Sequence, residues 1–495
     1  MPPLYYMEVP NKQVRVRFAP SPTGELHLGG ARTALYDFLF ARKLGGSVVL
    51  RIEDTDQKRY VEGSMDRFMD DLAWLGINFD ESPALGGPYA PYIQSERSQR
   101  HREIATELVK RGAAYYEFGG DANGGARDDE EYRAGRDVYR GKDRDLLLAE
   151  ALERVKAGES YVVRLKVPSS GTIKVSDLVR GDVLFDLATV DDAVLLKSDG
   201  MATYHLAAMV DDHEMAISHV FRSEEWLPST PKHILIYQAM EWQLPQFAHL
   251  PLLLAQDGKK LSKRVHGAAV WIRTYRDEGY LPEALINYLA LLGWNPGGND
   301  ELFTIGQLIE LFSIERVHKA GAKVDLIKLD AFQRHHIQQL PIEDLIVKLQ
   351  PFVKDELDAP LLMRLATVAR SRLGKLSEFS ELVAYFLALP DYEAGLLVFR
   401  KSTPDATQIG LKSAIEKLTL LGDQVWLDES LLARSLDEVV AERGLSNGDV
   451  FWPVRFALTG QERSPSPAEC LWVLGKEESL RRLAAAQEKL VKVIG

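Results

Sequence analysis

The beginning of the chain alternates strand-like and helix-like segments, and this order constrains the fold more than any other feature. Residues 14–20 alternate apolar and polar side chains and end at a proline, which is typical of a strand. Apolar residues then recur at helical spacing over 31–44, until a pair of glycines. Residues 47–52 are again strand-like, and 65–75 are helix-like. Strands that alternate with crossover helices predict a parallel sheet.

A second group of strand-like segments predicts a sheet inserted into this fold. Residues 119–145 are rich in glycine, acids and arginine, which indicates an insertion or a loop. One antiparallel or mixed sheet is predicted from the stretches 161–167, 173–178, 183–185 and 193–197. The α/β pattern returns at 217–242, and from about residue 275 the apolar spacing is mostly helical.

Charge and cysteine content exclude several classes of protein. The 60 Lys and Arg against 72 Asp and Glu give a net charge of −12, which excludes nucleic-acid or membrane binding by overall positive charge. Cys470 is the one cysteine, so neither an intramolecular disulfide nor a multi-thiolate metal site can form within the chain. At roughly 100 to 200 residues per domain, 495 residues predict about three to five units. Because neither a leader pattern nor a membrane-spanning stretch is present, we expect a cytoplasmic protein.

Two short motifs carry phosphate chemistry. Gly24-Glu-Leu-His-Leu-Gly-Gly30 lies between the first strand and helix, where glycines allow a phosphate close to free N–H groups and His27 adds a donor. Asp257-Gly-Lys-Lys-Leu-Ser-Lys-Arg264 is a cationic loop whose lysines can neutralise departing pyrophosphate. Taken singly, the first is explained better as a turn with a surface histidine, and the second as a solvated loop.

Together the motifs resemble the two signature sequences of class I aminoacyl-tRNA synthetases, whose most frequent forms are His-Ile-Gly-His and Lys-Met-Ser-Lys-Ser. Gly30 replaces the second histidine and Arg264 the final serine, departures that the glutamyl branch commonly shows. The intervening text also resembles glutamyl-tRNA synthetases, in Arg51-Ile-Glu-Asp-Thr-Asp56, Tyr92-Ile-Gln-Ser-Glu-Arg97, Val210-Asp-Asp-His213 and Gly279-Tyr-Leu-Pro-Glu-Ala284. The resemblance covers roughly residues 14–340 in register, with a looser helical match beyond.

The resemblance implies an α/β Rossmann-type catalytic domain with an inserted α+β acceptor-binding domain, followed by an all-α anticodon-binding region. It divides the chain into a first catalytic half at 1–98, the insertion at 99–203, a second catalytic half at 204–245, a stem-contact domain at 246–339 and the helical region at 340–495. Glutaminyl relatives use β-barrels in the last region, so helical periodicity there favours the glutamyl branch.

The same resemblance implies roles for single residues. Those that match glutamate-binding positions are Arg17, Ala19, Ser21, Glu53, Tyr204 and Arg222. The expected ATP-binding residues are His27, Gly29, Gly30 and Lys263, and the expected catalytic residues are His27, Lys260, Ser262 and Lys263. Arginine forks suit carboxylates bidentately. Without the resemblance, Arg17 would be interpreted as an ordinary surface arginine on a strand, because surface arginines are common.

The implied reaction has two steps. The α-carboxylate of L-glutamate attacks the α-phosphorus of ATP, and the adenylate then passes its acyl group to the 2′-hydroxyl of the terminal tRNA adenosine. No protein nucleophile is needed, so catalysis is positioning plus charge neutralisation, with Mg²⁺ accompanying ATP. Some relatives bind zinc through thiolates in the insertion; because residues 90–200 contain no cysteine, no zinc is expected. The run Asp211 to Glu214 is interpreted as structural, since adjacent residues at a strand end cannot all face one cation.

The expected macromolecular partner is tRNA specific for glutamate, bound by a monomer. Arg370 and Arg372 are candidate anticodon contacts, and Arg372 matches the helix where stringent glutamyl enzymes place an arginine near the wobble base. A plain phosphate contact explains Arg372 equally well. Two other functions remain open: a small-molecule nucleotidyltransferase, which would not need the long helical half, and a non-enzymatic RNA-binding paralogue, which would have lost its catalytic groups.

Overall fold

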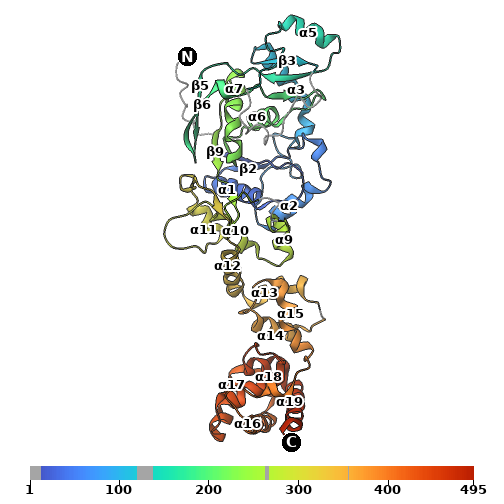
Figure 1. Ribbon diagram of the computed structural model, residues 1–495, viewed down its shortest axis with the longest axis vertical. Coiled ribbons are helices and arrows are strands. Elements are labelled where there is room, and N and C mark those ends of the chain that lie inside the picture. The colour runs from blue at the N-terminus through green and yellow to red at the C-terminus, as the bar shows by residue number, and fades with distance from the viewer. Residues whose placement is uncertain (1–12, 120–137, 262–266, 355, 495) are drawn as a thin grey trace. The chain divides into compact units, whose positions relative to one another are not determined.

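The computed structural model describes residues 13–119, 138–261, 267–354 and 356–494. The chain divides into two compact units (Figure 1). The first comprises residues 1–276 and 282–332, and the second comprises residues 277–281 and 333–495. The division between residues 332 and 333 falls inside helix α12 (Leu326–Gln339). It lies a few residues before the boundary at 339/340 that the sequence predicts.

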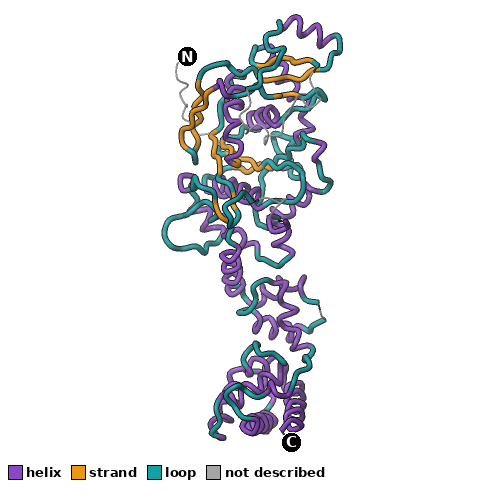
Figure 2. Tube along the Cα trace, in the orientation of Figure 1, coloured by secondary structure: helices purple, strands orange, loops and turns teal. Residues whose placement is uncertain are grey.

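The first unit combines strands and helices (Figure 2). Its strands are β1 (Arg15–Phe18), β2 (Ser47–Leu50), β3 (Ala114–Phe118), β4 (Tyr161–Leu165), β5 (Thr172–Asp177), β6 (Gly181–Asp186), β7 (Val194–Leu196), β8 (His219–Ser223), β9 (Gln246–Leu250), β10 (Leu253–Leu254) and β11 (Ala322–Lys323). The helices that begin in it are α1 (Leu28–Lys43), α2 (Ser64–Trp74), α3 (Ser98–Lys110), α5 (Leu148–Lys156), α6 (Tyr204–Glu214), α7 (Thr230–Ala239), α9 (Ile272–Asp277), α10 (Pro282–Ala290), α11 (Ile305–Leu311) and α12.

The predicted parallel sheet is present. Strand β1 pairs in parallel with β2, and β8 pairs in parallel with β9. The N–H of Ser218 donates to the carbonyl of Arg15 at 2.9 Å, which joins the two pairs. Gly46 allows β1 and β2 to meet, because a Cβ there would lie 2.4 Å from the carbonyl oxygen of Val14.

The strands predicted as one inserted sheet belong to two different sheets. Strands β3, β4 and β7 form an antiparallel sheet in the order β3-β4-β7. The hairpin of β5 and β6 instead joins β9 in the order β6-β5-β9-β8, with Asp177 opposite Phe247. The prediction of a single inserted sheet was therefore wrong, because sheet partners are chosen by contacts far along the chain.

Helix α1 begins and ends where its sequence requires. The Nδ1 atom of His27 accepts the N–H of Gly29 at 3.0 Å, which caps the helix start. Arg42 and Lys43 occupy the last turn, where positive charge is favourable. Gly45 follows with a φ of 65°, the left-handed conformation that often ends a helix.

Asp37 lies in the middle of α1 with a fully buried side chain, and neither carboxyl oxygen has a hydrogen-bond partner among the described residues. Burial raises its pKa well above the usual value, and Asp212 adds to this effect, while Arg17 opposes it. The folded chain therefore keeps a proton on Asp37 that the unfolded chain releases above about pH 4. Asp37 thus lowers the free energy of unfolding as the pH rises.

We expect Asp37→Asn to remove that destabilisation without changing the shape of the side chain. The variant and the parent should unfold at similar urea concentrations near pH 4. Above pH 4, the variant should gain stability relative to the parent by up to about 1.4 kcal/mol per pH unit, which is the effect of one proton bound in the folded state but not in the unfolded state. Urea midpoints at pH 5, 6 and 7 measure the difference. Parallel pH curves for the two proteins would show that Asp37 is ionised in the folded state.

Helices joined by loops make up the second unit, and no strand is assigned among its described residues (Figure 2). Its helices are α13 (Ile342–Leu349), α14 (Ala359–Ala369), α15 (Phe379–Leu387), α16 (Pro404–Thr419), α17 (Glu429–Arg443), α18 (Asn447–Thr459) and α19 (Pro467–Ile494). Arg482 of α19 is buried and donates to the carbonyls of Tyr385, Phe386 and Leu458, each at 2.7 Å. These carbonyls lie in the last turns of α15 and α18, so one cation satisfies both helix ends.

Candidate active site

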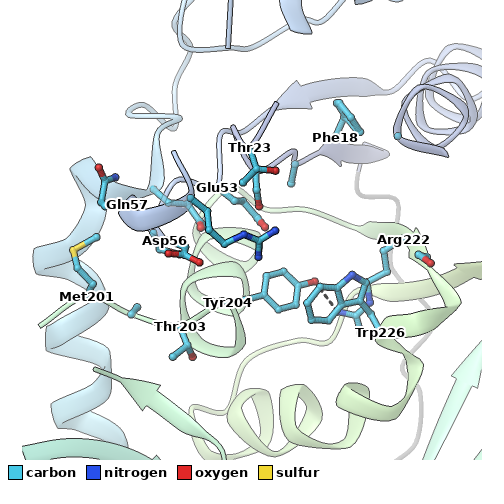
Figure 3. A pocket seen from close by; sticks show the side chains of 18 of the residues that line it. Phe18, Thr23, Glu53, Asp56, Gln57, Met201, Thr203, Tyr204, Arg222 and Trp226 are labelled. Carbon is cyan, nitrogen blue, oxygen red and sulfur yellow. Dashed lines mark hydrogen bonds between the residues drawn. The ribbon is translucent and has the colours of Figure 1, made fainter. Parts of the chain in front are cut away.

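A cavity of about 850 Å³ opens in the first unit where β1 and β8 end and α1 begins (Figure 3). Its lining residues come from the end of β1, the first turn of α1, the loop after β2, the segment before α6 and the segment after β8. The carboxyl ends of parallel strands are where open α/β sheets usually bind ligands. The cavity is large enough for a small ligand of drug size.

The cavity brings together residues that lie more than two hundred positions apart, such as Arg17 and Trp226. All of the residues predicted to hold glutamate line it: Arg17, Ala19, Ser21, Glu53, Tyr204 and Arg222. Gly29 and Gly30, predicted to bind ATP, line it as well. His27 and Lys260 are outside its lining.

Arg222 carries a buried positive charge into one corner of the cavity and is 5% exposed. Its Nε donates to Nε2 of His249 at 3.0 Å, and its Nη2 donates to Oγ1 of Thr230 at 2.9 Å. Its Nη1 donates to the Tyr204 hydroxyl at 3.1 Å (Figure 3). The same Nη1 also bonds to Nδ1 of His233 at 3.1 Å. Burial lowers the pKa of His249 to about 4 and that of His233 well below its usual value. All four partners are therefore uncharged at neutral pH.

A buried ion network holds the opposite wall. Oδ1 of Asp212 accepts from Nε of Arg17 at 3.0 Å and from Nη1 of Arg51 at 2.7 Å. Arg51 also donates to Oε1 of Glu53 at 2.9 Å, and Arg17 donates to the carbonyl of Phe221 at 3.2 Å. Burial raises the pKa of Glu53, although Arg51 and Arg17 oppose this effect. Arg222 therefore reaches the cavity with four of its five N–H groups bonded to protein. Arg17 has two such bonds, from Nε and Nη1.

The first motif forms the cap of α1 and contacts the chain that follows the second motif. The ring of His27 meets that of Trp271 edge to face, with centres 5.8 Å apart. The two residues also pair as an antiparallel bridge, and the N–H of Ile272 donates to the carbonyl of Leu26 at 2.9 Å. The structure thus brings the neighbourhoods of the two motifs together across more than two hundred residues.

Only part of the second motif lies in the described residues. The turn at Gly258 has a φ of 81°, and Leu254 and Lys260 pair across it. The side chain of Lys260 is 53% exposed and forms an ion pair with Oε1 of Glu225 at 2.5 Å. Ser262 and Lys263 lie outside the described residues.

The acidic run from Asp211 to Glu214 forms structural contacts, in agreement with its interpretation from the sequence. Asp211 accepts from Gln94 and Arg97, and its Oδ1 lies 2.9 Å from Nε2 of His101. Asp212 holds the ion network described above. The stated reason was wrong, because the run ends helix α6 rather than a strand. Within the part of the chain that is described, no group of three His, Cys, Asp or Glu side chains could hold a metal ion.

Residues 13–331 match a family model described as "tRNA synthetases class I (E and Q), catalytic domain". This match covers more than half of the chain and includes every residue that lines the cavity. The chain belongs to the class I tRNA synthetases. A second model, described as "Anticodon binding domain", matches residues 344–487.

Curated relatives of this class I synthetase match it over nearly its whole length. The glutamate–tRNA ligase of Cytophaga hutchinsonii is 41% identical over 96% of this chain and 97% of its own. That of Dehalococcoides mccartyi is 42% identical over 97% of this chain and 98% of its own. A crystal structure of a glutamate–tRNA ligase from Elizabethkingia meningosepticum, in complex with its amino acid, matches with a TM-score of 0.86 at 36% identity. This match covers 97% of the present chain and 100% of the Elizabethkingia chain.

The two arginines predicted to contact the anticodon lie just after α14 in the second unit of the synthetase. Arg370 donates to the carbonyl of Leu340 at 3.3 Å. Arg372 donates to the carbonyl of Val368 at 2.7 Å, and its Nη2 lies 3.7 Å from Glu469 with a third of the side chain exposed. Both lie within the part matched by the anticodon-binding model.

Several lining residues were not singled out from the sequence. Trp226 packs against Tyr204 with ring centres 4.2 Å apart, and Lys197 and Met201 line the wall before α6. Trp226 lies four residues after Arg222, and Thr55 and Asp56 lie two and three residues after Glu53. Closeness in sequence to a predicted site residue was therefore the one signal that could have identified them.

Among the described helices of this synthetase, none is both long and apolar enough to cross a membrane.

Proposed function

We propose that this chain is a glutamate–tRNA ligase whose cavity binds L-glutamate and ATP and forms glutamyl-adenylate. Its relatives at 40–42% identity over nearly the full chain carry that name, so the enzyme charges tRNA with glutamate. The observation that carries the amino-acid site is Arg222, a buried cation with four uncharged partners at the cavity wall. A buried cation of this kind calls for an anionic partner, and the side-chain carboxylate of glutamate supplies one.

The chemistry of this site is positioning and charge neutralisation. We place the phosphates of ATP at the first turn of α1, where Gly29 and Gly30 line the cavity and the positive end of the helix dipole favours negative charge. Mg²⁺, carried by the phosphates, would neutralise part of their charge. Glu53 would receive the α-ammonium of glutamate, and Arg17 would orient its α-carboxylate. Attack on the α-phosphorus then releases pyrophosphate, and the 2′-hydroxyl of tRNA takes the acyl group and releases AMP.

Lysines of the second motif would neutralise the departing pyrophosphate. The Lys260 ion pair with Glu225 is half exposed, and exposed pairs contribute little stability. Lys260 can therefore exchange Glu225 for phosphate at small cost. Lys263 and Ser262 would act from the same loop.

We expect Lys263→Ala to lower glutamate-dependent ATP–pyrophosphate exchange by at least about 10²-fold. One preorganised contact to a transition-state anion is typically worth roughly 3 kcal/mol. The KM for glutamate should change little, because the cation acts on the phosphates. Lys259→Ala is the matched control, since Lys259 lies just before the part of this loop that resembles the Lys-Met-Ser-Lys-Ser signature and its side chain is 79% exposed. Exchange at the parent rate in the Lys263 variant would remove that residue from the mechanism.

For tRNA, we propose that the helical second unit reads the anticodon, with Arg370 and Arg372 among its contacts. The match to the anticodon-binding model supports this assignment. Arg372 would disfavour the glutamine anticodon at the wobble base. We also propose a cytoplasmic monomer without zinc, and the five-part division at 1–98, 99–203, 204–245, 246–339 and 340–495.

One set of assays tests the function against its alternatives. ATP–pyrophosphate exchange is measured with glutamate, glutamine and aspartate, each with and without tRNA, followed by charging of glutamate and glutamine tRNAs. A ligase exchanges with glutamate and charges the tRNA. A small-molecule nucleotidyltransferase would show no transfer to tRNA, and an RNA-binding paralogue would bind tRNA without exchange. Efficient charging of glutamine tRNA would contradict the role given to Arg372.

A further inference from the structure

Behind Arg222, and outside the cavity lining, lies a buried pair of side chains that the chemistry above does not use. His249 lies on β9 and accepts the Nε–H of Arg222 at its Nε2, over 3.0 Å. The other ring nitrogen, Nδ1, lies 2.6 Å from Oδ2 of Asp177. Both side chains are completely buried, and neither lines the cavity.

These contacts determine the tautomer of His249. Arginine offers only N–H donors, so Nε2 of His249 must carry the lone pair that faces Arg222. The ring proton must then lie on Nδ1, where the carboxylate of Asp177 accepts it. Burial lowers the pKa of His249 to about 4, so the ring is neutral and keeps this arrangement at physiological pH.

Asp177 is held rigidly by the backbone. Its Oδ1 accepts the N–H groups of Val179 at 2.9 Å and Arg180 at 2.8 Å. Its Oδ2 also accepts the backbone N–H of His249 at 3.1 Å. Asp177 is also the residue through which β5 pairs with β9. A continuous series of hydrogen bonds therefore runs from the loop after β5 through Asp177 and His249 to Arg222.

The position of His249 on the guanidinium is distinctive. It bonds Nε, whereas Tyr204, His233 and Thr230 bond the two Nη atoms. A hydrogen bond at Nε restricts rotation of the guanidinium plane about the last rotatable bond of the arginine side chain. A neutral acceptor also leaves the charge of Arg222 available, whereas a carboxylate at the same place would cancel it.

We propose that His249, oriented by Asp177, is a positioning residue that aims the guanidinium of Arg222 at the side-chain carboxylate of the amino-acid substrate. The inference rests on the proposed function, because it assigns Arg222 to glutamate. His249 lies outside the cavity lining and acts through Arg222. Its Nε2 also lies 3.3 Å from Oγ1 of Thr230, which is itself a partner of Arg222.

The sharpest test is Asp177→Asn. The asparagine carbonyl can keep the bonds from Val179 and Arg180, while its NH₂ group faces Nδ1 of His249 as a donor. The ring then moves its proton to Nε2, where it opposes the N–H of Arg222. Loss of a hydrogen bond to a charged group corresponds to about 10- to 100-fold in affinity, so we expect the KM for glutamate to rise by that factor. The KM for ATP and the melting temperature should stay near those of the parent.

Two variants at His249 complete the series, each assayed by ATP–pyrophosphate exchange. His249→Leu removes the acceptor and should raise the KM for glutamate as Asp177→Asn does. His249→Gln keeps a carbonyl acceptor and should recover most of that loss. His219→Leu is the matched control, because His219 is a half-buried histidine of β8 bonded to Ser218, with no role in the cavity.

The outcomes are distinguishable. An unchanged KM for glutamate in Asp177→Asn and His249→Leu would overturn the inference. Equal rises in the KM values for glutamate and ATP, or the same rise in the His219 control, would also overturn it, since they indicate general loss of structure. A parent protein that shows no exchange with glutamate would contradict the proposed function instead.

Discussion

Arg222→Gln is expected to lower kcat/KM for glutamate about 10³-fold while leaving the value for glutamine nearly unchanged. The four partners of Arg222 are uncharged, so the variant removes the positive charge from that corner of the cavity. A buried carboxylate without a partner costs about 3–5 kcal/mol, and about 1.4 kcal/mol is tenfold in rate. An amide substrate carries no such penalty, because neutral groups can satisfy it.

The glutamate-to-glutamine ratio of kcat/KM in pyrophosphate exchange is the quantity to measure. Arg15→Gln is a suitable control, because Arg15 lies two residues before Arg17, bonds to Glu81 at 2.7 Å and is outside the cavity lining. That variant should keep the parent ratio. Equal losses for both amino acids in Arg222→Gln would mean that Arg222 does not read the substrate side chain.

Asp212→Ala is expected to cost about 3–5 kcal/mol of stability, because it leaves two buried guanidinium groups without their shared counter-ion. The side chains of Asp212 and Arg51 are completely buried and that of Arg17 is 4% exposed. Although burial alone would raise the pKa of Asp212, Arg17 and Arg51 hold it below the usual value. The stabilisation is therefore fully present at neutral pH and is lost only on acidification below the ordinary carboxyl range.

Urea unfolding at pH 7 measures this loss. Asp182→Ala is the control, since Asp182 pairs with Lys174 at 2.6 Å but both side chains are more than half exposed, so no measurable change is expected. Equal midpoints for the Asp212 and Asp182 variants would show that the buried network does not support the fold.

Elements with a local pattern were predictable, and elements without one were not. Helix α1 has recurring apolar residues and a glycine stop, and it was predicted. Helix α6 was missed because seven consecutive residues from Leu206 to Asp212 are buried, so its sequence has no polar face to reveal a helical period. The hairpin of β5 and β6 was placed in the wrong sheet, since its partner β9 lies about seventy residues further along the chain.

The candidate site divides in the same way. Arg17, Glu53 and Arg222 were proposed from motifs that resemble a known family. Their partners Asp212 and His249 could not be inferred as partners, because a contact between positions 195 apart, as for Arg17 and Asp212, or 27 apart, as for Arg222 and His249, leaves no local trace. Asp212 was interpreted as structural from its neighbours alone, and the network that explains this role became visible only in three dimensions.

The link between Arg17 and Asp212 also bears on how the chain is made. A ribosome adds residues at about 5 to 20 per second, so the 195 residues between the two positions take about 10 to 40 seconds to appear. Throughout that time the nascent first strand carries a guanidinium whose counter-ion has not been synthesised. We therefore expect the first strand to become stably buried only after the sequence through Asp212 has left the exit tunnel.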